Sequence, residues 1–248
     1  MPVRTAVVVA LLVTLVLSAG ALLPAAAAAK GPQKPPPSSA LEGLDVSQWQ
    51  GTVDWTRVAA AGKRFAFIRA SAGSLSNDPL YAANRAGANA AGLKVGAYHF
   101  ANPDAKPGDA LVEADFFLSL ATPAHGDLLP VLDLEVSNGL STADLQTWAM
   151  TWLERVRETL GVRAMIYTSP NFWQTSMGDT TAFAAAGYQV LWIANWRVTQ
   201  PTVPAENWDG KGWTFWQYSG CGSVRGIRGC VDLDRYHGTS LAAYLLIP

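Results

Sequence analysis

Short apolar runs, rich in β-branched and aromatic residues and bounded by turn formers, recur along the chain from residue 43 onward. Runs of this length and composition are typical of β-strands. The pattern predicts eight strands, at residues 43–47, 65–71, 94–101, 128–136, 163–169, 190–196, 212–219 and 229–236.

Between the earlier strands, apolar residues recur every three to four positions, which is the spacing of one face of an α-helix. The clearest helix opens with Ser141-x-x-Asp144, a capping-box pattern, and carries Leu145, Trp148 and Val156 along one face. Five helices are predicted, at about residues 54–62, 79–91, 108–121, 142–160 and 170–186. The stretches between the last three strands, residues 197–211 and 220–228, show no helical period.

Strands that alternate with helices form a mostly parallel sheet, and eight such strands can close into a barrel. We therefore predict an α/β fold, an irregular TIM-like barrel with eight strands and about five helices, whose last part lacks outer helices. The length of 248 residues, half of them apolar, suits one such domain.

The N-terminal 29 residues combine one arginine, a long apolar core and a small-residue stretch that ends at Ala29, the pattern of a secretory signal peptide. The alternative is an uncleaved membrane anchor, because the run is long enough to span a bilayer; Pro24 and the following alanines disfavour it. Residues 30–41 are rich in Pro and Ser and predict a stiff linker, which leaves residues 42–248 for the barrel. We expect a secreted monomer with no membrane attachment in its mature form.

The formal net charge of −1 argues against a nucleic-acid partner. The chain has two cysteines, Cys221 and Cys230, and export makes a disulfide between them the natural expectation; two free buried thiols are the alternative. With three histidines and no further cysteine, no zinc-type spacing is present, so we predict no metal and no cofactor.

The run VLDLEV, residues 131–136, places two carboxylates on one face of an otherwise apolar strand. Side chains alternate along a strand, so Asp133 and Glu135 point the same way, with Cα atoms roughly 6.6 Å apart. In such barrels the active site lies at the C-terminal ends of the strands. Two carboxylates this close have their pKa values driven apart, which supplies an acid and a base at one pH.

Two other predicted strands also carry acidic residues, Asp45 in the first and Asp232 and Asp234 in the last. Closure of the barrel makes these two strands neighbours, so their acids can join Asp133 and Glu135 in one site. Each acid taken alone is better explained as a turn, a helix cap or an ion pair. We assign Asp234, which is next to Arg235, to structure.

A carboxylate cluster without a nucleophile triad, a phosphate loop or metal ligands indicates glycoside hydrolysis, in which a carboxylic acid protonates the leaving oxygen. Aromatic side chains near strand ends are candidates for binding sugar rings, with core packing as the alternative for each. These candidates are Tyr98, Tyr167, Trp196 and Trp216.

The order of several segments resembles the family 25 glycoside hydrolases, which are N-acetylmuramidase-type lysozymes. The segments are GLDVSQWQGTVDW (43–55), VGAYHFANP (95–103), PVLDLEV (130–136), MIYTSPNFW (165–173), LWIANW (191–196) and FWQYSGCGSVRGIRGCVDLDRY (215–236). This resemblance covers about residues 42 to 237. It implies a barrel of eight strands and five helices that cleaves the β-1,4 bond from N-acetylmuramic acid to N-acetylglucosamine in bacterial peptidoglycan.

The resemblance also implies roles for residues of this chain. Glu135 matches the general acid/base, Asp133 its partner, and Asp45 and Asp232 supporting carboxylates. The positions that match groove residues are Tyr98, Tyr167, Trp216 and Gln217.

The chain departs from the family pattern in two places. In RASAG (69–73), Arg69 keeps a positive charge but Ala72 stands where an acid is common, which puts a polar contact there in doubt. Trp196 stands where a tyrosine is frequent and would alter a subsite.

The expected mechanism is substrate-assisted. The N-acetyl oxygen of the sugar attacks while Asp133 stabilises the charge and Glu135 transfers the proton, with net retention. An inverting route with Asp133 or Asp232 as base is the alternative.

Two rival functions stay open. A chitinase-like hydrolase also uses D-x-E, but the longer D-x-x-D-x-D-x-E run is missing, because Leu128 and Val131 occupy its first positions. The other rival is a non-catalytic barrel that binds the cell wall.

Overall fold

The computed structural model describes residues 40–247, and its sheet closes on itself. The predicted signal peptide and nearly all of the predicted linker lie outside the described residues. The barrel strands are β1 (Leu41–Val46), β2 (Lys63–Ala72), β4 (Lys94–Phe100), β5 (Val131–Asp133), β6 (Met165–Thr168), β7 (Leu191–Ala194), β8 (Phe215–Gly222) and β9 (Val231–Tyr236). A two-residue strand, β3 (Ser76–Asn77), pairs with the end of β2.

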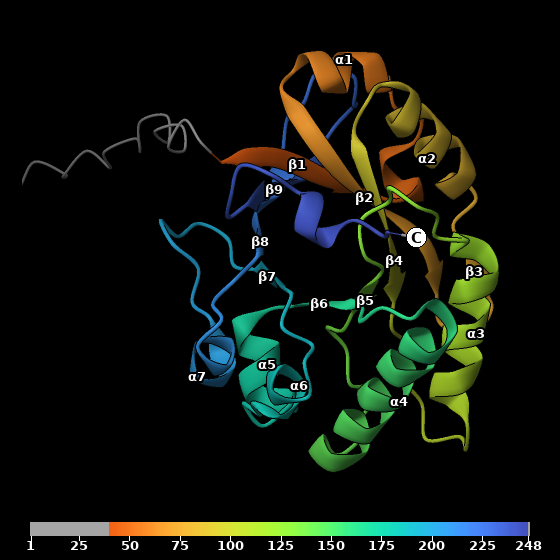
Figure 1. Cartoon of the computed structure of the whole chain (residues 1–248), viewed down its shortest axis with the longest axis vertical. Coiled ribbons are helices and arrows are strands. Elements are labelled where there is room, and N and C mark those ends of the chain that lie inside the picture. The colour runs from red at the N-terminus through yellow and green to blue at the C-terminus, as the bar shows by residue number, and fades with distance from the viewer. Residues whose placement is uncertain (1–39, 248) are drawn as a thin grey trace, which may run out of the picture. The chain divides into compact units, whose positions relative to one another are not determined.

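All eight predicted strands and the predicted fold class are confirmed (Figure 1). Neighbouring strands are parallel from β1 through β2, β4, β5, β6 and β7 to β8, and β9 lies antiparallel between β8 and β1. The barrel is mixed because the connection from Gly222 to Val231 is shorter than the dozen or more residues that a parallel crossover needs.

Four predicted helices are confirmed as α1 (Trp55–Ala60), α2 (Tyr81–Ala90), α3 (Asp109–Ala121) and α4 (Thr142–Leu160). The last two lie side by side against the barrel (Figure 1). The expected helix at 170–186 is instead two helices, α5 (Pro170–Ser176) and α6 (Ala182–Ala185), because the intervening Gly178 and Asp179 both have positive φ.

One further helical turn, α7 (Pro204–Asp209), was not predicted. Its residues from Ala205 to Asp209 have φ values between 51° and 60°, so the turn is left-handed. A left-handed turn does not produce the right-handed helical period that a sequence pattern can reveal. Two short 3-10 helices, η1 (Gln48–Gln50) and η2 (Ala242–Tyr244), complete the described elements.

Large aromatic side chains fill the interior of the barrel. Phe67 stacks on Trp192 at 4.3 Å between ring centroids and meets Phe215 edge to face. Phe65 packs edge to face against both Phe67 and Phe215. Gly43 leaves room for the ring of Phe65, because a Cβ at that position would lie 2.3 Å from it. The barrel is therefore a packed core, and the site it supports must lie at an end.

The segment after β9 closes the end of the barrel where the parallel strands begin. Leu245 bridges to Leu128, just ahead of β5, and Tyr244 packs edge to face on Phe215 and Tyr236. The C-terminal ends of the parallel strands lie at the opposite end, which is called the mouth below.

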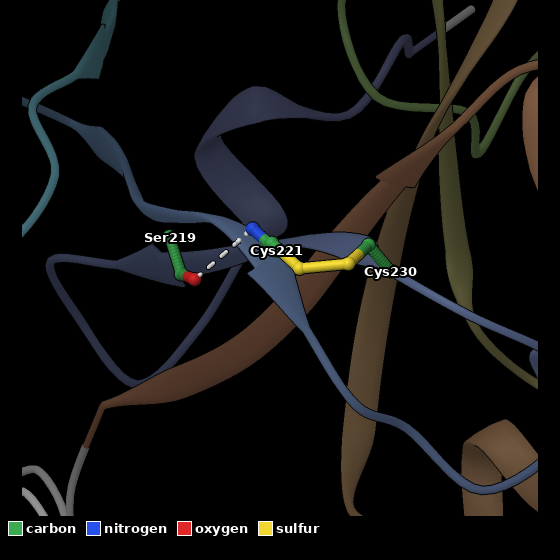
Figure 2. Close-up of a disulfide and its surroundings, with 3 residues drawn as sticks. All are labelled: Ser219, Cys221 and Cys230. Carbon is green, nitrogen blue, oxygen red and sulfur yellow. Dashed lines mark hydrogen bonds between the residues drawn. A yellow bond between two sulfur atoms is a disulfide. The ribbon is translucent and has the colours of Figure 1, made fainter.

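The predicted disulfide is present between Cys221 and Cys230, across the β8–β9 hairpin (Figure 2). The backbone N–H of Cys221 donates to Ser219 Oγ at 3.3 Å, and Asp54 N–H ties the hairpin to the start of α1 by donating to Gly226 O at 2.8 Å. Within residues 40–247, no helix has the length and apolar character needed to cross a membrane.

Candidate active site

Four acids that the sequence singled out meet at the mouth of the barrel. Asp45 on β1 stands directly opposite Asp232 on β9, while Asp133 ends β5 and Glu135 follows it. Their negative charges act on one another, since Asp45 is influenced by both Asp133 and Asp232, and Glu135 by Asp232. The predicted acidic site is thus assembled from three strands.

Glu135 lies just beyond β5, because the strand ends at Asp133 and not at residue 136 as expected. Its side chain is exposed at the mouth and makes no hydrogen bond within the described residues. Desolvation by the surrounding walls, followed by the nearby charge of Asp232, raises the pKa of Glu135 above its usual value. A carboxyl that keeps its proton and is accessible is suited to act as a general acid.

Asp133 is the buried partner of Glu135, with 6% of its surface exposed. Its Oδ1 is buried and has no hydrogen-bond partner among the described residues. Burial, then the charge of Glu135, raises the pKa of Asp133 well above its usual value, while Arg69 opposes that change. An orphaned buried acceptor beside the proposed acid is a ready partner for a substrate N–H.

Arg69 finds its carboxylate partner in Asp78, which the sequence analysis missed. Arg69 Nε donates to Asp78 Oδ2 at 3.1 Å, and the same oxygen accepts the backbone N–H of Gln48 at 2.8 Å. The acid that is missing at Ala72 is therefore not needed to hold the arginine. Nothing in the local pattern around Asp78 distinguishes it from a turn residue.

Gln217 joins the aromatic and acidic parts of the site. Its Oε1 accepts from Tyr167 OH at 3.1 Å and from Trp196 Nε1 at 3.0 Å, and its Nε2 donates to Asp45 Oδ2 at 2.8 Å. The two donors on Oε1 fix the orientation of the amide, so the NH₂ group must face Asp45. That bond lowers the pKa of Asp45, but burial and the charges of Asp234 and Asp232 outweigh it and raise the pKa.

Of the four aromatic candidates, three lie near the acids and one, Trp216, does not. Tyr98 and Tyr167 are buried in the interior directly below the acids, and Trp196 is 50% exposed. Trp216 is not brought to the site. It lies on the outer face of β8, where its Nε1 donates to Asn195 O at 2.8 Å, because neighbours on a strand face opposite sides and Gln217 takes the inner one.

The same alternation corrects the reasoning about Asp234. Arg235 faces outward, where its Nε pairs with Glu42 Oε1 at 3.2 Å. Asp234 faces into the barrel and is fully buried, with Oδ1 accepting from Trp192 Nε1 at 2.9 Å. The signal that could have shown this is the i, i+2 spacing from Asp232.

Two cavities lie away from the acids. One of about 460 Å³ separates the N-terminal ends of α3 and α4, and the other, of about 410 Å³, lies beside Trp216 on the outer wall. Neither is lined by Asp45, Asp133, Glu135 or Asp232. Among residues 40–247, no group of three or more His, Cys, Asp or Glu side chains is arranged to hold a metal ion. The absence of a metal or cofactor stays a prediction.

Comparisons with known proteins identify the family of the chain. Residues 44–227 match the family model of the glycosyl hydrolases family 25. The chain is 38% identical over 212 residues to lysozyme M1 of Streptomyces globisporus, covering 82% of this chain and 70% of that one. It is 32% identical over 212 residues to the N,O-diacetylmuramidase of a Chalaropsis species, covering 77% and 96%.

A solved structure gives the same result for the fold. The bacterial lysozyme of Streptomyces coelicolor superposes with a TM-score of 0.75 at 37% identity, covering 85% of this chain and 97% of that one. The chain belongs to the glycosyl hydrolases family 25.

Proposed function

We propose that the chain hydrolyses the β-1,4 bond between N-acetylmuramic acid and N-acetylglucosamine in bacterial peptidoglycan. Its family makes it a glycoside hydrolase, and its relatives, named lysozyme and N,O-diacetylmuramidase, support a muramidase. The observation that carries the proposal is the pairing of an exposed Glu135 of raised pKa with a buried Asp133 whose Oδ1 is unpartnered within the described residues.

Glu135 acts first as the acid. Its proton passes to the glycosidic oxygen as the bond from that oxygen to C1 of the muramic acid breaks. The carboxylate left behind later takes a proton from water, which attacks C1. The raised pKa of Glu135 supports the first role, and its exposure at the mouth supports access for water.

Asp133 assists the N-acetyl group of the substrate. The acetamido oxygen attacks C1 as the leaving group departs. Asp133 acts in its ionised form, which the nearby charge of Arg69 favours; it accepts the acetamido N–H and stabilises the positive charge that develops. A substrate-assisted route fits an acid pair two residues apart, since a direct carboxylate nucleophile needs carboxyl groups about 5 Å apart. When water attacks C1, the bond between C1 and the acetamido oxygen breaks, which restores the N-acetyl group and leaves a reducing end with net retention.

Other charged groups lie near Glu135 and Asp133. Asp45 and Asp232 supply negative charge next to the oxocarbenium-like transition state, and the positive charge of Arg69 favours the ionised form of Asp133. The remaining candidates line or support the groove; these are Tyr98, Tyr167, Trp196 and Gln217.

We propose further that residues 1–29 direct export, residues 30–41 tether the domain and residues 42–248 form the catalytic barrel. Peptidoglycan lies outside the cytoplasmic membrane, and the Cys221–Cys230 disulfide supports an oxidising compartment. A monomeric state remains a prediction.

The test is a digestion of purified peptidoglycan by the mature protein and by its Glu135→Gln variant. The products are reduced, and the new ends are identified by mass spectrometry. Reduced muramic acid ends from the parent alone support a muramidase centred on Glu135. Reduced glucosamine ends, cleavage of chitin oligosaccharides in preference to peptidoglycan, or no turnover would contradict it, the last in favour of a binding barrel.

Proton NMR of the first-formed anomer tests the mechanism separately. Initial release of the β-anomer supports retention, and initial release of the α-anomer would replace substrate assistance by the inverting route. Asp133→Asn should lower kcat far more than it raises KM, because the contact it removes strengthens in the transition state.

A further inference from the structure

The segment that carries Glu135 is held by few backbone contacts. The strand β5 ends at Asp133, and the next residue, Leu134, donates its backbone N–H to Tyr167 O at 2.9 Å. Beyond that point, no backbone N–H from Glu135 to Asn138 donates a hydrogen bond among the described residues. The Glu135 carboxyl forms no hydrogen bond there either, so its place at the mouth depends on how its backbone is held.

Asn138 supplies a contact that the backbone of this segment lacks. Its Nδ2 donates to Asn102 Oδ1 at 2.8 Å and to Pro103 O at 3.2 Å, and both acceptors lie in the connection from β4 to α3. The carbonyl of Pro103 can only accept, so the NH₂ end of the Asn138 amide must face it, and that group has one hydrogen for each acceptor. The side chain of Asn138 therefore ties the Glu135 segment to the neighbouring connection.

Asn102 is in turn bound to a buried carboxyl group that the proposed mechanism does not use. Its backbone N–H donates to Glu113 Oε2 at 3.1 Å, and Glu113, on α3, has 1% of its surface exposed. The same oxygen lies 2.8 Å from His99 Nε2, and His99 Nδ1 lies 2.8 Å from Ser71 Oγ. Because His99 and Ser71 are also fully buried, Asn102 is attached to a fixed part of the core.

We propose that Asn138 is a positioning residue that holds the Glu135 segment against the connection from β4 to α3, which the buried Glu113 anchors. Glu135 then keeps a fixed place among the titratable groups at the mouth. These groups are Asp133 on β5, Tyr167 on β6 and Asp232 on β9. A small displacement of a reacting group can cost about a hundredfold in rate. The role in catalysis rests on the proposed function, whereas the holding of the segment does not.

The holding of the segment is tested without substrate, by nitrogen NMR relaxation of the parent and of Asn138→Gly. Asn138 has a φ of 47°, which glycine adopts without strain, so the substitution removes the amide and permits the same backbone. From Glu135 to Asn138 the parent should be rigid, with order parameters of about 0.85, and the variant should fall below about 0.6. Equal values in the two proteins, or a segment already mobile in the parent, would overturn the proposal whether or not the protein cleaves peptidoglycan.

The positioning role is tested by kinetics. Asn138→Gly should lower kcat about tenfold with KM little changed, because proton transfer depends on the place of the Glu135 carboxyl. The alkaline limb of the kcat profile should also move to lower pH. Glu135 would then be free to leave the surrounding walls and the charge of Asp232, which together raise its pKa.

An unchanged kcat, or a lower kcat with an unchanged pH profile, would overturn the positioning role. A parent without any turnover would contradict the proposed function instead, and the order parameters would still decide whether Asn138 holds the segment.

Asn207→Gly is the matched control, because Asn207 is also exposed and has a φ of 60° but lies in the left-handed turn of α7. It should leave kcat, the pH profile and the order parameters near Glu135 as they are in the parent. A loss as large as that of Asn138→Gly would show an effect of glycine alone and would overturn the proposal. Thermal unfolding shows whether each variant folds.

Asn102→Ala is a second variant, which removes one acceptor of the Asn138 amide without introducing a glycine. It should lower kcat about threefold, since the bond to Pro103 remains. The double variant should be no slower than Asn138→Gly alone, because both changes act on one contact. Losses that multiply in the double variant would show that the two residues act separately, and the proposal would be wrong.

Discussion

Replacing Asp232 by Asn should stabilise the protein above neutral pH while impairing its activity. Burial raises the pKa of Asp232 from 3.8 to about 6 in the folded protein. A carboxyl whose folded pKa is raised binds its proton more tightly in the folded state than in the unfolded one. The unfavourable effect of Asp232 on folding is therefore absent below pH 3.8, grows as the pH rises and is complete above about 6.

The size of the effect follows from the same values. A pKa raised from 3.8 to about 6 corresponds to about 3 kcal/mol at pH 8. Asp232 is only partly buried, so solvent screening reduces the expected gain to about 1–2 kcal/mol. Asn resembles the protonated acid, and the gain should vanish at pH 3.5.

Urea unfolding of the parent and of Asp232→Asn, at several pH values between 3.5 and 8, measures this difference. Glu158→Gln is the control, because Glu158 is exposed on α4, and its effect should stay within about 0.5 kcal/mol at every pH. A gain that is the same at pH 3.5 and pH 8, or a loss at pH 8, would refute the reasoning.

Three further outcomes are expected. Gln217→Met should lower the free energy of unfolding by about 3 kcal/mol and reduce kcat, since it leaves buried partners without hydrogen bonds; urea unfolding giving less than 1 kcal/mol would contradict this. Glu206→Gly in the left-handed turn should stabilise the folded protein by about 0.5 kcal/mol, because glycine adopts positive φ without strain, whereas Glu158→Gly in right-handed α4 should destabilise it by about 1 kcal/mol. If thermal unfolding shows both variants shifted in the same direction, backbone handedness does not explain the effects. Replacing Cys221 and Cys230 by Ser should cost about 2.7 kcal/mol by urea unfolding, from the short loop that they close, and an unchanged midpoint would show that the hairpin is held by its other contacts.

The hydrophobic period of the sequence was sufficient for most of the fold. Eight strands and four helices follow from it because each buries one face against a layer, which imposes a period on the residues. The period fails where the backbone departs from regular geometry, as at Asp179 and in the turn from Ala205 to Asp209, which have positive φ. Tertiary contacts hold these conformations, among them the bond from Ala205 N–H to Asp179 Oδ1 at 2.7 Å.

For the site, alternation along strands proved more reliable than proximity in sequence. Applied to β8 and β9, it would have separated Trp216 from Gln217 and Arg235 from Asp234. Asp78 could not be found this way, because its contact with Arg69 depends on the return of the chain after β3.

Because β9 runs antiparallel to its neighbours, the length of the loop at the mouth can change without a change in the size of the barrel. After each parallel strand the chain must return to the far end of the barrel before the next strand begins. The connection is therefore long and packs in the outer layer of the barrel. The β8–β9 hairpin returns at once, beside Asp232 and within reach of α1. Residues inserted between Gly222 and Val231 would lengthen the loop at the mouth while leaving the strand register and the barrel circumference unchanged. The length of glycan that the enzyme contacts can therefore vary at this hairpin without any change to the carboxyl groups of the site.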